Sequence, residues 1–322
     1  MSSTIIRVII SLVILAVIFL RMDVDVYSLL AAVKNPVCLA AAFLIPFTLM
    51  PIFSINRWKL FLGMIGIREK FSTLFTINYI AQFHGMILPS AQGQDVFRIY
   101  QIEKRHPEKR GQAGSTVLIE RMFGLILLIL FSLFSLPFAA ESGDVRMCAV
   151  LISASAVLTF AAVVTVCTPW GYRLYVGRRT RFAFINKAID YLEKVHRSMI
   201  TFPYRKVILS SVFLIAGFQL STVLIVYLLF CACGCYMPFF DHLALFPLIA
   251  ILTMIPVTIA GFGIREGFFI YFYCKMGITP PTALTVSLTY YILTGIVPSI
   301  FGGLIWLISK NYTTPKKNDR NI

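Results

Sequence analysis

Long apolar segments recur from one end of this chain to the other, and they restrict its fold more than any other feature. A helix needs about 20 such residues to cross roughly 30 Å of hydrocarbon. Six segments have about the required length: 4–20, 36–55, 112–138, 146–168, 207–232 and 281–308. Only 13% of the residues are charged, about half the usual fraction in a soluble domain. We therefore predict a single all-α, polytopic membrane domain over residues 1–322, with six full spans.

Two further apolar stretches, 71–102 and 243–276, are interrupted near their middles by proline, glycine, an acid and an arginine. Proline removes a backbone donor and glycine weakens a helix, so each stretch is predicted to unwind. The breaks contain Pro89, Gly93, Pro256, Gly261 and Gly263. Irregular backbone at membrane depth needs protein or a cavity beside it. Although either stretch could cross fully, we favour two re-entrant or broken helical hairpins of opposite orientation, as in an inverted repeat.

Basic residues are concentrated in a few segments between the apolar ones. These segments are the loops 56–70, 103–110 and 169–206 and the tail 309–322. The positive-inside rule places all of them in the cytoplasm. It also explains the formal net charge of +15, so no nucleic-acid-binding function is needed to account for that charge. We therefore predict a multi-pass protein of the inner (cytoplasmic) membrane with both termini cytoplasmic. Loop 169–206 then joins two halves, 1–168 and 207–308.

Two segments are predicted to lie at the membrane surface. Residues 183–192 have helical apolar spacing within the long basic loop, which indicates an amphipathic helix on the headgroups. Trp58 lies in loop 56–70, and tryptophan is enriched at headgroup level. Anchoring is the simpler role for both segments, and recognition of a specific lipid is the alternative.

Charged residues inside predicted membrane segments are the strongest functional candidates. They are Asp95, Arg98, Glu120, Arg121, Arg265 and Glu266. Moving a charge to the bilayer centre costs at least about 2.5 kcal/mol, so a charged residue in a membrane segment is a candidate for a functional role. Because arginine can donate two parallel hydrogen bonds to a phosphate group, one hypothesis is a midplane site for an anionic headgroup. The alternative is a static ion network.

The spacing of these charges suggests how they pair. Asp95 and Arg98 are three residues apart and can meet on one helix face. Adjacent residues point about 100° apart on a helix, which disfavours pairing within Glu120–Arg121 or Arg265–Glu266. Pairing between the three sets is therefore expected.

Uncharged polar residues before the first break are expected to line the same cavity. They are Asn78, Gln82 and His84. Neither a P-loop nor an HExxH, GxSxG or Rossmann motif occurs in the sequence. We accordingly assign no catalytic residue, metal site or cofactor, and the sequence favours a transporter over an enzyme. The seven cysteines lack the paired spacing of a zinc site and are expected to be inert.

Several short motifs carry a resemblance to a known family. They are Asn56-Arg57-Trp58, Gly93-Gln94-Asp95-Val96-Phe97-Arg98, Ile119-Glu120-Arg121-Met122-Phe123-Gly124, Gly261-Phe262-Gly263-Ile264-Arg265-Glu266-Gly267 and Gly302-Gly303. In this order they resemble the transmembrane region of the lysylphosphatidylglycerol synthetases, the membrane half of the multiple peptide resistance factor. Two departures are Gln94, where a second glycine is expected, and the lack of an aminoacyl-transferase domain in this sequence.

The resemblance implies a flippase-like membrane region that moves a lipid between leaflets, and in other members a partnership with glycosyltransferases. Our leading hypothesis is a translocase for an anionic phospholipid or lipid-linked saccharide, whose partners are a phosphate-bearing lipid and an envelope-synthesis enzyme. The main alternative is an integral membrane glycosyltransferase or accessory subunit, with Asp23 and Asp25 as candidate metal ligands. A carrier that binds protons at Glu120 and Glu266, and a non-catalytic scaffold, are the remaining hypotheses.

Overall fold

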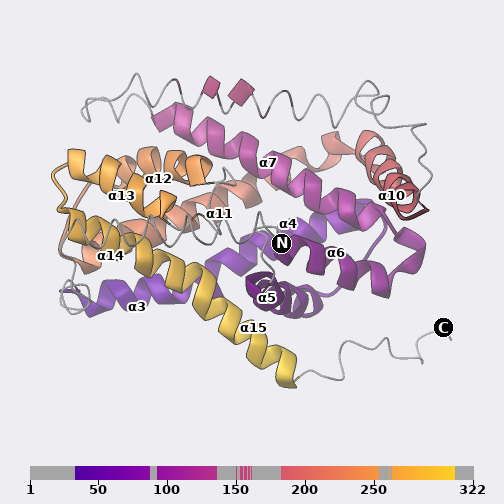
Figure 1. Cartoon of the computed structure of the whole chain (residues 1–322), viewed down its shortest axis with the longest axis horizontal. Coiled ribbons are helices and arrows are strands. Elements are labelled where there is room, and N and C mark those ends of the chain that lie inside the picture. The colour runs from indigo at the N-terminus through magenta and orange to yellow at the C-terminus, as the bar shows by residue number, and fades with distance from the viewer. Residues whose placement is uncertain are drawn as a thin grey trace.

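The computed structural model describes residues 33–87, 93–135, 183–253, 261 and 263–308, with scattered positions between 150 and 161. Helices are the only regular secondary structure in these parts of the chain. Most of them run along the long axis of the molecule (Figure 1). The prediction of an all-helical, polytopic membrane protein is confirmed.

Four helical segments are long and apolar enough to cross a membrane: Pro36–Met64, Gln112–Phe134, Tyr204–Ala232 and Pro280–Ile308. The first combines α3 (Pro36–Leu44), η1 (Ile45–Phe47) and α4 (Leu49–Met64), and the second is α7 (Gln112–Ser135). The third is α11 (Tyr204–Ala232), and the fourth combines α14 (Pro280–Tyr291), the π-helical turn η5 (Ile292–Ile296) and α15 (Val297–Ile308). These segments correspond to four predicted spans. The other two predicted spans, 4–20 and 146–168, lie wholly or mostly outside the described residues.

Both interrupted stretches form two helices where the sequence predicts a break. The first gives α5 (Phe71–Ile87) and α6 (Gly93–Arg105), and the second gives α12 (Phe239–Thr253) and α13 (Ile264–Lys275). Gly261 and Gly263 have φ of +75° and +84°, which is left-handed backbone that other residues rarely adopt. The two prolines of the breaks, Pro89 and Pro256, lie outside the described residues.

Helices α5 and α6 pack closely where they approach the break between them. A Cβ atom on Gly85 would lie 2.7 Å from the backbone nitrogen of Gln94, so only glycine permits this approach. The rings of His84 and Phe97 stack beside it, with centroids 4.2 Å apart. The pair is therefore a packed helical hairpin, and its re-entry into the membrane stays a prediction.

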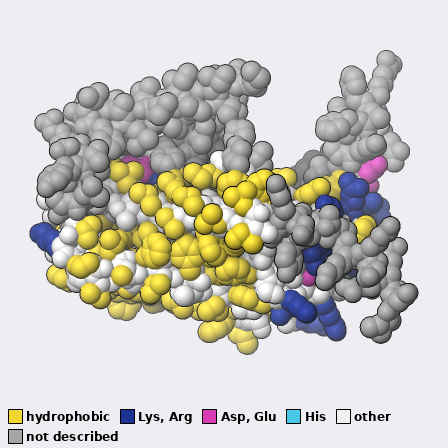
Figure 2. Space-filling view, turned by 90° about the horizontal axis from the view of Figure 1, so that it is seen from below, with side chains coloured by type: hydrophobic (Ala, Val, Ile, Leu, Met, Phe, Trp, Pro, Cys, Tyr) yellow, Lys and Arg dark blue, Asp and Glu magenta, His cyan; other side chains and the backbone are white. Residues whose placement is uncertain are grey.

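The predicted basic loops meet at one end of the molecule. Arg105 pairs with Glu69 at 2.8 Å, and Tyr191 donates a hydrogen bond to Glu103 at 3.0 Å. Tyr191 belongs to α10 (Ala183–Ile200), which confirms the predicted helix in the long loop. Burial and the neighbouring Glu103 carboxylate raise the pKa of Tyr191. On the face shown in Figure 2, most of the visible Lys and Arg side chains lie at this end, beside a largely apolar body. We call it the basic end.

Trp58 is not placed as predicted. Its side chain is only 1% exposed and belongs to a buried cluster with Ile55, Leu62 and Leu74. The reason is that α4 continues to Met64, so that Trp58 faces neighbouring helices where a headgroup position was expected. Its indole ring instead lies against the guanidinium of Arg98, 4.1 Å from ring centroid to Cζ.

Glycine also permits close contact between α5 and α15. A Cβ atom on Gly302 would overlap the backbone carbonyl of Tyr79, whereas one on Gly124 in α7 would meet nothing within 4 Å. We expect Gly302→Ala to separate these helices and to lower the free energy of unfolding by about 1–3 kcal/mol, the usual cost of overpacking. Thermal unfolding in detergent measures the effect, with Gly124→Ala as the matched control. Equal stability of the two variants would contradict this packing.

Candidate functional site

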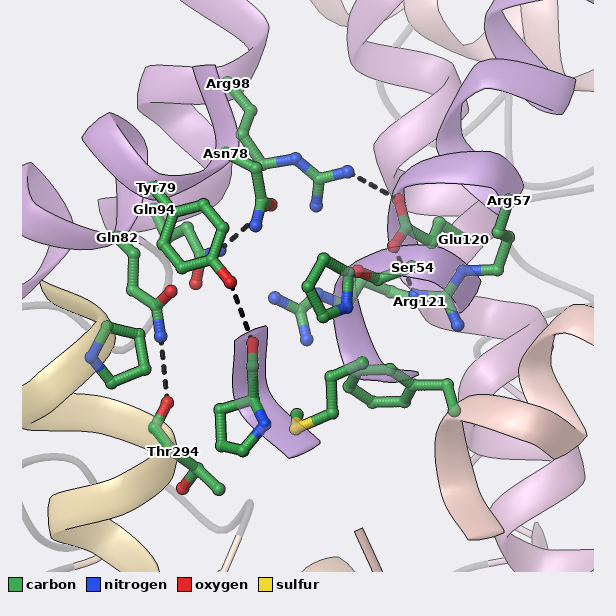
Figure 3. Close-up of a pocket in the computed structure, with 15 residues that line it drawn as sticks. Ser54, Arg57, Asn78, Tyr79, Gln82, Gln94, Arg98, Glu120, Arg121 and Thr294 are labelled. Atoms are coloured by element: carbon green, nitrogen blue, oxygen red, sulfur yellow. Dashed lines mark hydrogen bonds and ion pairs between the residues drawn. The ribbon is translucent and has the colours of Figure 1, made fainter. Parts of the chain in front are cut away.

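The Glu120 carboxylate on α7 is held between two arginines from other helices. Arg57 on α4 donates to Oε1, and Arg98 on α6 donates to Oε2 at 2.9 Å. The glutamate is 5% exposed and both arginines are buried. Figure 3 shows the two guanidinium groups approaching the carboxylate from different helices. This cluster therefore joins three helices: α4, α6 and α7.

A second acid extends the cluster. Asp95, in the first turn of α6, accepts from Arg121 at 2.8 Å and lies 3.5 Å from Arg98. The Asp95–Arg98 pair confirms the expectation from their spacing. Pairing of the Glu120–Arg121 set with the Asp95–Arg98 set is confirmed as well. Three guanidinium groups thus face two carboxylates, and the cluster carries one positive charge in excess.

A cavity of about 250 Å³ lies beside this cluster (Figure 3). Its wall includes side chains from both halves of the chain. They are Pro46, Met50, Pro51, Ser54, Arg57, Asn78, Tyr79, Gln82, Gln94, Arg98, Glu120, Arg121, Phe218, Thr294 and Pro298. The polar groups come mainly from the first half, and α11, η5 and α15 supply the opposite wall.

Arg121 is the accessible guanidinium of the cluster. Its side chain is 48% exposed, against 9% for Arg57 and 6% for Arg98. In Figure 3 it extends into the middle of the cavity. Asp95 holds one edge of this guanidinium through Nε and Nη2. The remaining donors can therefore meet an acceptor in the cavity while Asp95 keeps the group in place.

The amide side chains orient the wall opposite the arginines. Gln82 donates to the carbonyl of Thr294 at 2.9 Å, and that carbonyl belongs to the π-helical turn η5. Gln94 and Asn78 approach each other at 3.5 Å. Asn78 and Gln82 thus line the cavity as expected. His84 is not among the lining residues, because its ring lies between Phe97 and Trp306.

Arg265 and Glu266 form a separate cluster at the start of α13. Arg265 pairs with Glu266 at 2.6 Å, so the expectation that adjacent residues would not pair is wrong here. The reason is the helix start, because the Glu266 carboxylate turns back to accept from the Gly263 backbone N–H at 2.7 Å. Ser287 and the ring of Tyr291 surround the arginine. Neither Arg265 nor Glu266 lines the cavity described above.

One charged member of the site is not predicted from the sequence. The charge pattern places Arg57 in a cytoplasmic loop as a topology signal, yet this arginine is 7% exposed and bound to Glu120. The available signal was its position one residue before Trp58 in a motif that also carries the family resemblance. Four uncharged polar residues of the cavity wall are also not selected from the sequence: Ser54, Tyr79, Gln94 and Thr294. Asp23 and Asp25, the candidate metal ligands of the alternative hypothesis, lie outside the described residues. Within the described part of the chain, no group of three His, Cys, Asp or Glu side chains could hold a metal.

Comparison with known proteins gives matches over nearly the whole chain. Residues 4–302 match the family model described as "Lysylphosphatidylglycerol synthase TM region". A UPF0104 membrane protein of Methanocaldococcus jannaschii is 24% identical over 98% of this chain and 97% of its own length. A second UPF0104 membrane protein, from Methanothermobacter thermautotrophicus, is 19% identical over 83% of this chain and 82% of its own. Each relative therefore has about the same extent as this chain.

The double pairing of Glu120 makes it the most sensitive position of the site. Replacing it with Gln leaves Arg57 buried without a counter-charge among the described residues and leaves Arg98 with Asp95 at 3.5 Å, and breaking a buried pair costs about 3–5 kcal/mol. We expect Glu120→Gln to unfold at a clearly lower temperature in detergent. Glu108→Gln, which alters a 64% exposed side chain at the basic end, is the control and should change stability by less than about 0.5 kcal/mol. A Glu120→Gln variant as stable as wild type would show that the cluster contributes little to folding.

Proposed function

This chain belongs to the lysylphosphatidylglycerol synthase TM-region family, and from that premise we propose that it is a lipid translocase. Its substrate would be an anionic phospholipid or a lipid-linked saccharide, moved between leaflets with the phosphate of the headgroup bound in the cavity beside Glu120. The wall of the cavity supplies charged and amide groups together with apolar ones such as Met50 and Phe218. Such a site suits a molecule that carries a charged group on an apolar body.

One observation carries the proposal: Arg121 is half exposed in a cavity whose charges sum to one positive excess. A cluster with one more guanidinium than carboxylate is costly within a membrane protein unless an anion shares its environment. A phosphate group accepts from the planar fork of arginine, and here it would meet a guanidinium already fixed by Asp95. In a purely static ion network, we would expect Arg121 to pair with a second carboxylate and to be buried.

The buried part of the cluster would then set the binding strength. Glu120 and Asp95 together offset two of the three guanidinium charges, so a phosphate group meets one excess positive charge rather than three free arginines. A transported ligand has to leave as well as enter, which favours such moderate binding. The Nε atoms of Arg57 and Arg98 are buried and have no hydrogen-bond partner among the described residues, which adds to the positive field of the cluster without offering a contact to the ligand.

The cellular setting is part of the proposal. We place the basic end on the cytoplasmic side of the inner membrane, with both termini on that side. A glycosyltransferase or another envelope-synthesis enzyme is the proposed partner. The alternative, that this chain is itself a glycosyltransferase or an accessory subunit, depends on Asp23 and Asp25 outside the described residues.

Substitution of Arg121 tests the function directly. We expect Arg121→Gln to slow lipid movement between leaflets at least about tenfold, because a hydrogen bond to a charged group contributes about 1.5–3 kcal/mol. The measurement is the rate at which fluorescent phosphatidylglycerol becomes accessible to a quencher in proteoliposomes. Asp95 keeps Arg98 as a partner in this variant, so folding should persist.

Arg68→Gln is the matched control for that experiment, since it removes an exposed positive charge from the loop 65–70, which is not part of the cavity wall. Its transport rate should equal that of wild type. If neither wild type nor the control moves phosphatidylglycerol or any lipid of a broad anionic panel, the translocase proposal fails. If Arg121→Gln transports normally, the cavity is not the path.

The orientation can be tested separately from transport. Alkaline phosphatase is active only outside the cytoplasm, so an insertion after Gly234, at the end opposite the basic one, should be active in a bacterial host. An insertion after Arg110, at the basic end, should be inactive. The positive-inside rule is the physical reason for this difference. The opposite pattern of activities would show that the basic end faces outward.

A further inference from the structure

A second cavity, of about 530 Å³, lies at the basic end and is separate from the one that contains Arg121. Its wall comes from the end of α4, the turn η2 (Pro107–Lys109), the start of α7 and the last turns of α10. The lining residues include Met64, Ile65, Arg110, Lys194, Arg197 and Phe202. None of these residues also lines the first cavity.

The charge of this cavity is strongly positive. Arg110, Lys194 and Arg197 line it, and Glu108 is the acid among the lining residues. Glu108 is 64% exposed and is oriented toward His106, with Oε1 3.5 Å from its Nδ1. In the described part of the chain, Arg110 and Lys194 have no carboxylate within salt-bridge distance. Glu103 on α6 accepts from the Gly111 backbone and from Tyr191.

The depth of the cavity in the membrane follows from the helices that border it. Met64 is the last residue of one membrane-spanning segment, and Gln112 is the first residue of another. Pro203 directly precedes the third such segment, Tyr204–Ala232. Three spans therefore begin or end at this cavity, which places it where hydrocarbon gives way to headgroups.

Apolar and basic groups lie together in the wall. Met64 is partly exposed, and Phe202 is 5% exposed beneath the cavity. A hydrogen bond between Ser198 and Ser115 at 2.8 Å holds helix α10 against α7. The wall of the cavity is therefore formed by helices that contact one another. An apolar floor beside three cations, at headgroup depth, matches a phospholipid better than a soluble anion.

We propose that this cavity is a second binding site, which holds the phosphate of an anionic phospholipid of the adjoining leaflet. Arg110 and Lys194 would contact the phosphate oxygens, while Met64 and Phe202 would contact the glycerol and the first methylene groups. Bound lipid would tie α10 to the ends of α4 and α7. This site is independent of the proposed translocation cavity and would exist even if the chain moved no lipid.

Local hydrogen exchange on the full chain in nanodiscs tests the proposal. Adding phosphatidylglycerol to phosphatidylcholine discs should slow exchange in residues 107–112 and 197–203, the backbone that surrounds the cavity. In Arg110→Gln/Lys194→Gln the half-saturating fraction of phosphatidylglycerol should rise about 30-fold, which abolishes the slowing at attainable fractions. Because the readout is local, lipid bound at Arg121 does not contribute to it.

The control is Arg68→Gln/Lys70→Gln, which removes two positive charges from the same end but outside this cavity. It should retain the slowing seen in wild type. An equal loss in this control would show that surface charge alone attracts the lipid, and would overturn the proposal. The same slowing by inorganic phosphate or glycerol phosphate in phosphatidylcholine discs would identify a site for a soluble anion and would also overturn it.

The charge-conserving variant Arg110→Lys/Lys194→Arg separates loss of binding from loss of folding. It keeps both cations and should show the slowing at a similar fraction of phosphatidylglycerol. If it loses the slowing together with the glutamine variant, the two positions act through folding and the proposal is wrong.

Discussion

The rest of this structure depends on one buried carboxylate. Glu120 lies between Arg57 and Arg98, and these three residues come from α7, α4 and α6. Placing charges away from water costs several kcal/mol for each ion, and only good geometry with further hydrogen bonds offsets that cost. The Trp58 ring against Arg98 supplies part of that environment. Since each partner belongs to a different helix, the electrostatic requirement of Glu120 fixes the relative positions of all three.

That arrangement explains why a cavity can persist beside the cluster. The arginines that pair with Glu120 are nearly fully buried, and the carboxylates of Glu120 and Asp95 lie against them, so the apolar helices pack around paired charges. Asp95 then holds Arg121 by one edge and leaves the other edge accessible. Under the proposed function, Glu120 with its two arginines would serve folding and the accessible Arg121 would serve binding. The two alternatives posed by the sequence, a static network and a ligand site, would then apply to different members of one cluster.

Much of the fold was predictable because membrane insertion imposes simple rules. Apolar length located four spans that the structure describes, and the Pro/Gly breaks located the ends of α5, α6, α12 and α13. The meeting of the basic loops also followed from charge alone. Which charges pair could be predicted only in part, because pairing depends on helix rotation and on where each helix begins. Arg57 shows the limit, since α4 extends beyond the apolar run and carries this arginine into the protein.

The two breaks have similar sequences and use their charges differently. In the first, α6 begins at Gly93, and Asp95 in its first turn bonds a side chain of α7. In the second, Glu266 bonds the backbone of Gly263 at the start of its own helix, and Arg265 closes onto that same carboxylate. A carboxylate that caps its own helix has little capacity left to orient a neighbour's arginine. Both acids lie two residues after the first residue of their helix, Gly93 in α6 and Ile264 in α13. Their partners differ: Asp95 holds Arg121, which lines the cavity, whereas Glu266 caps its own helix. The first break, and not the second, therefore contributes charged groups to the wall of the cavity.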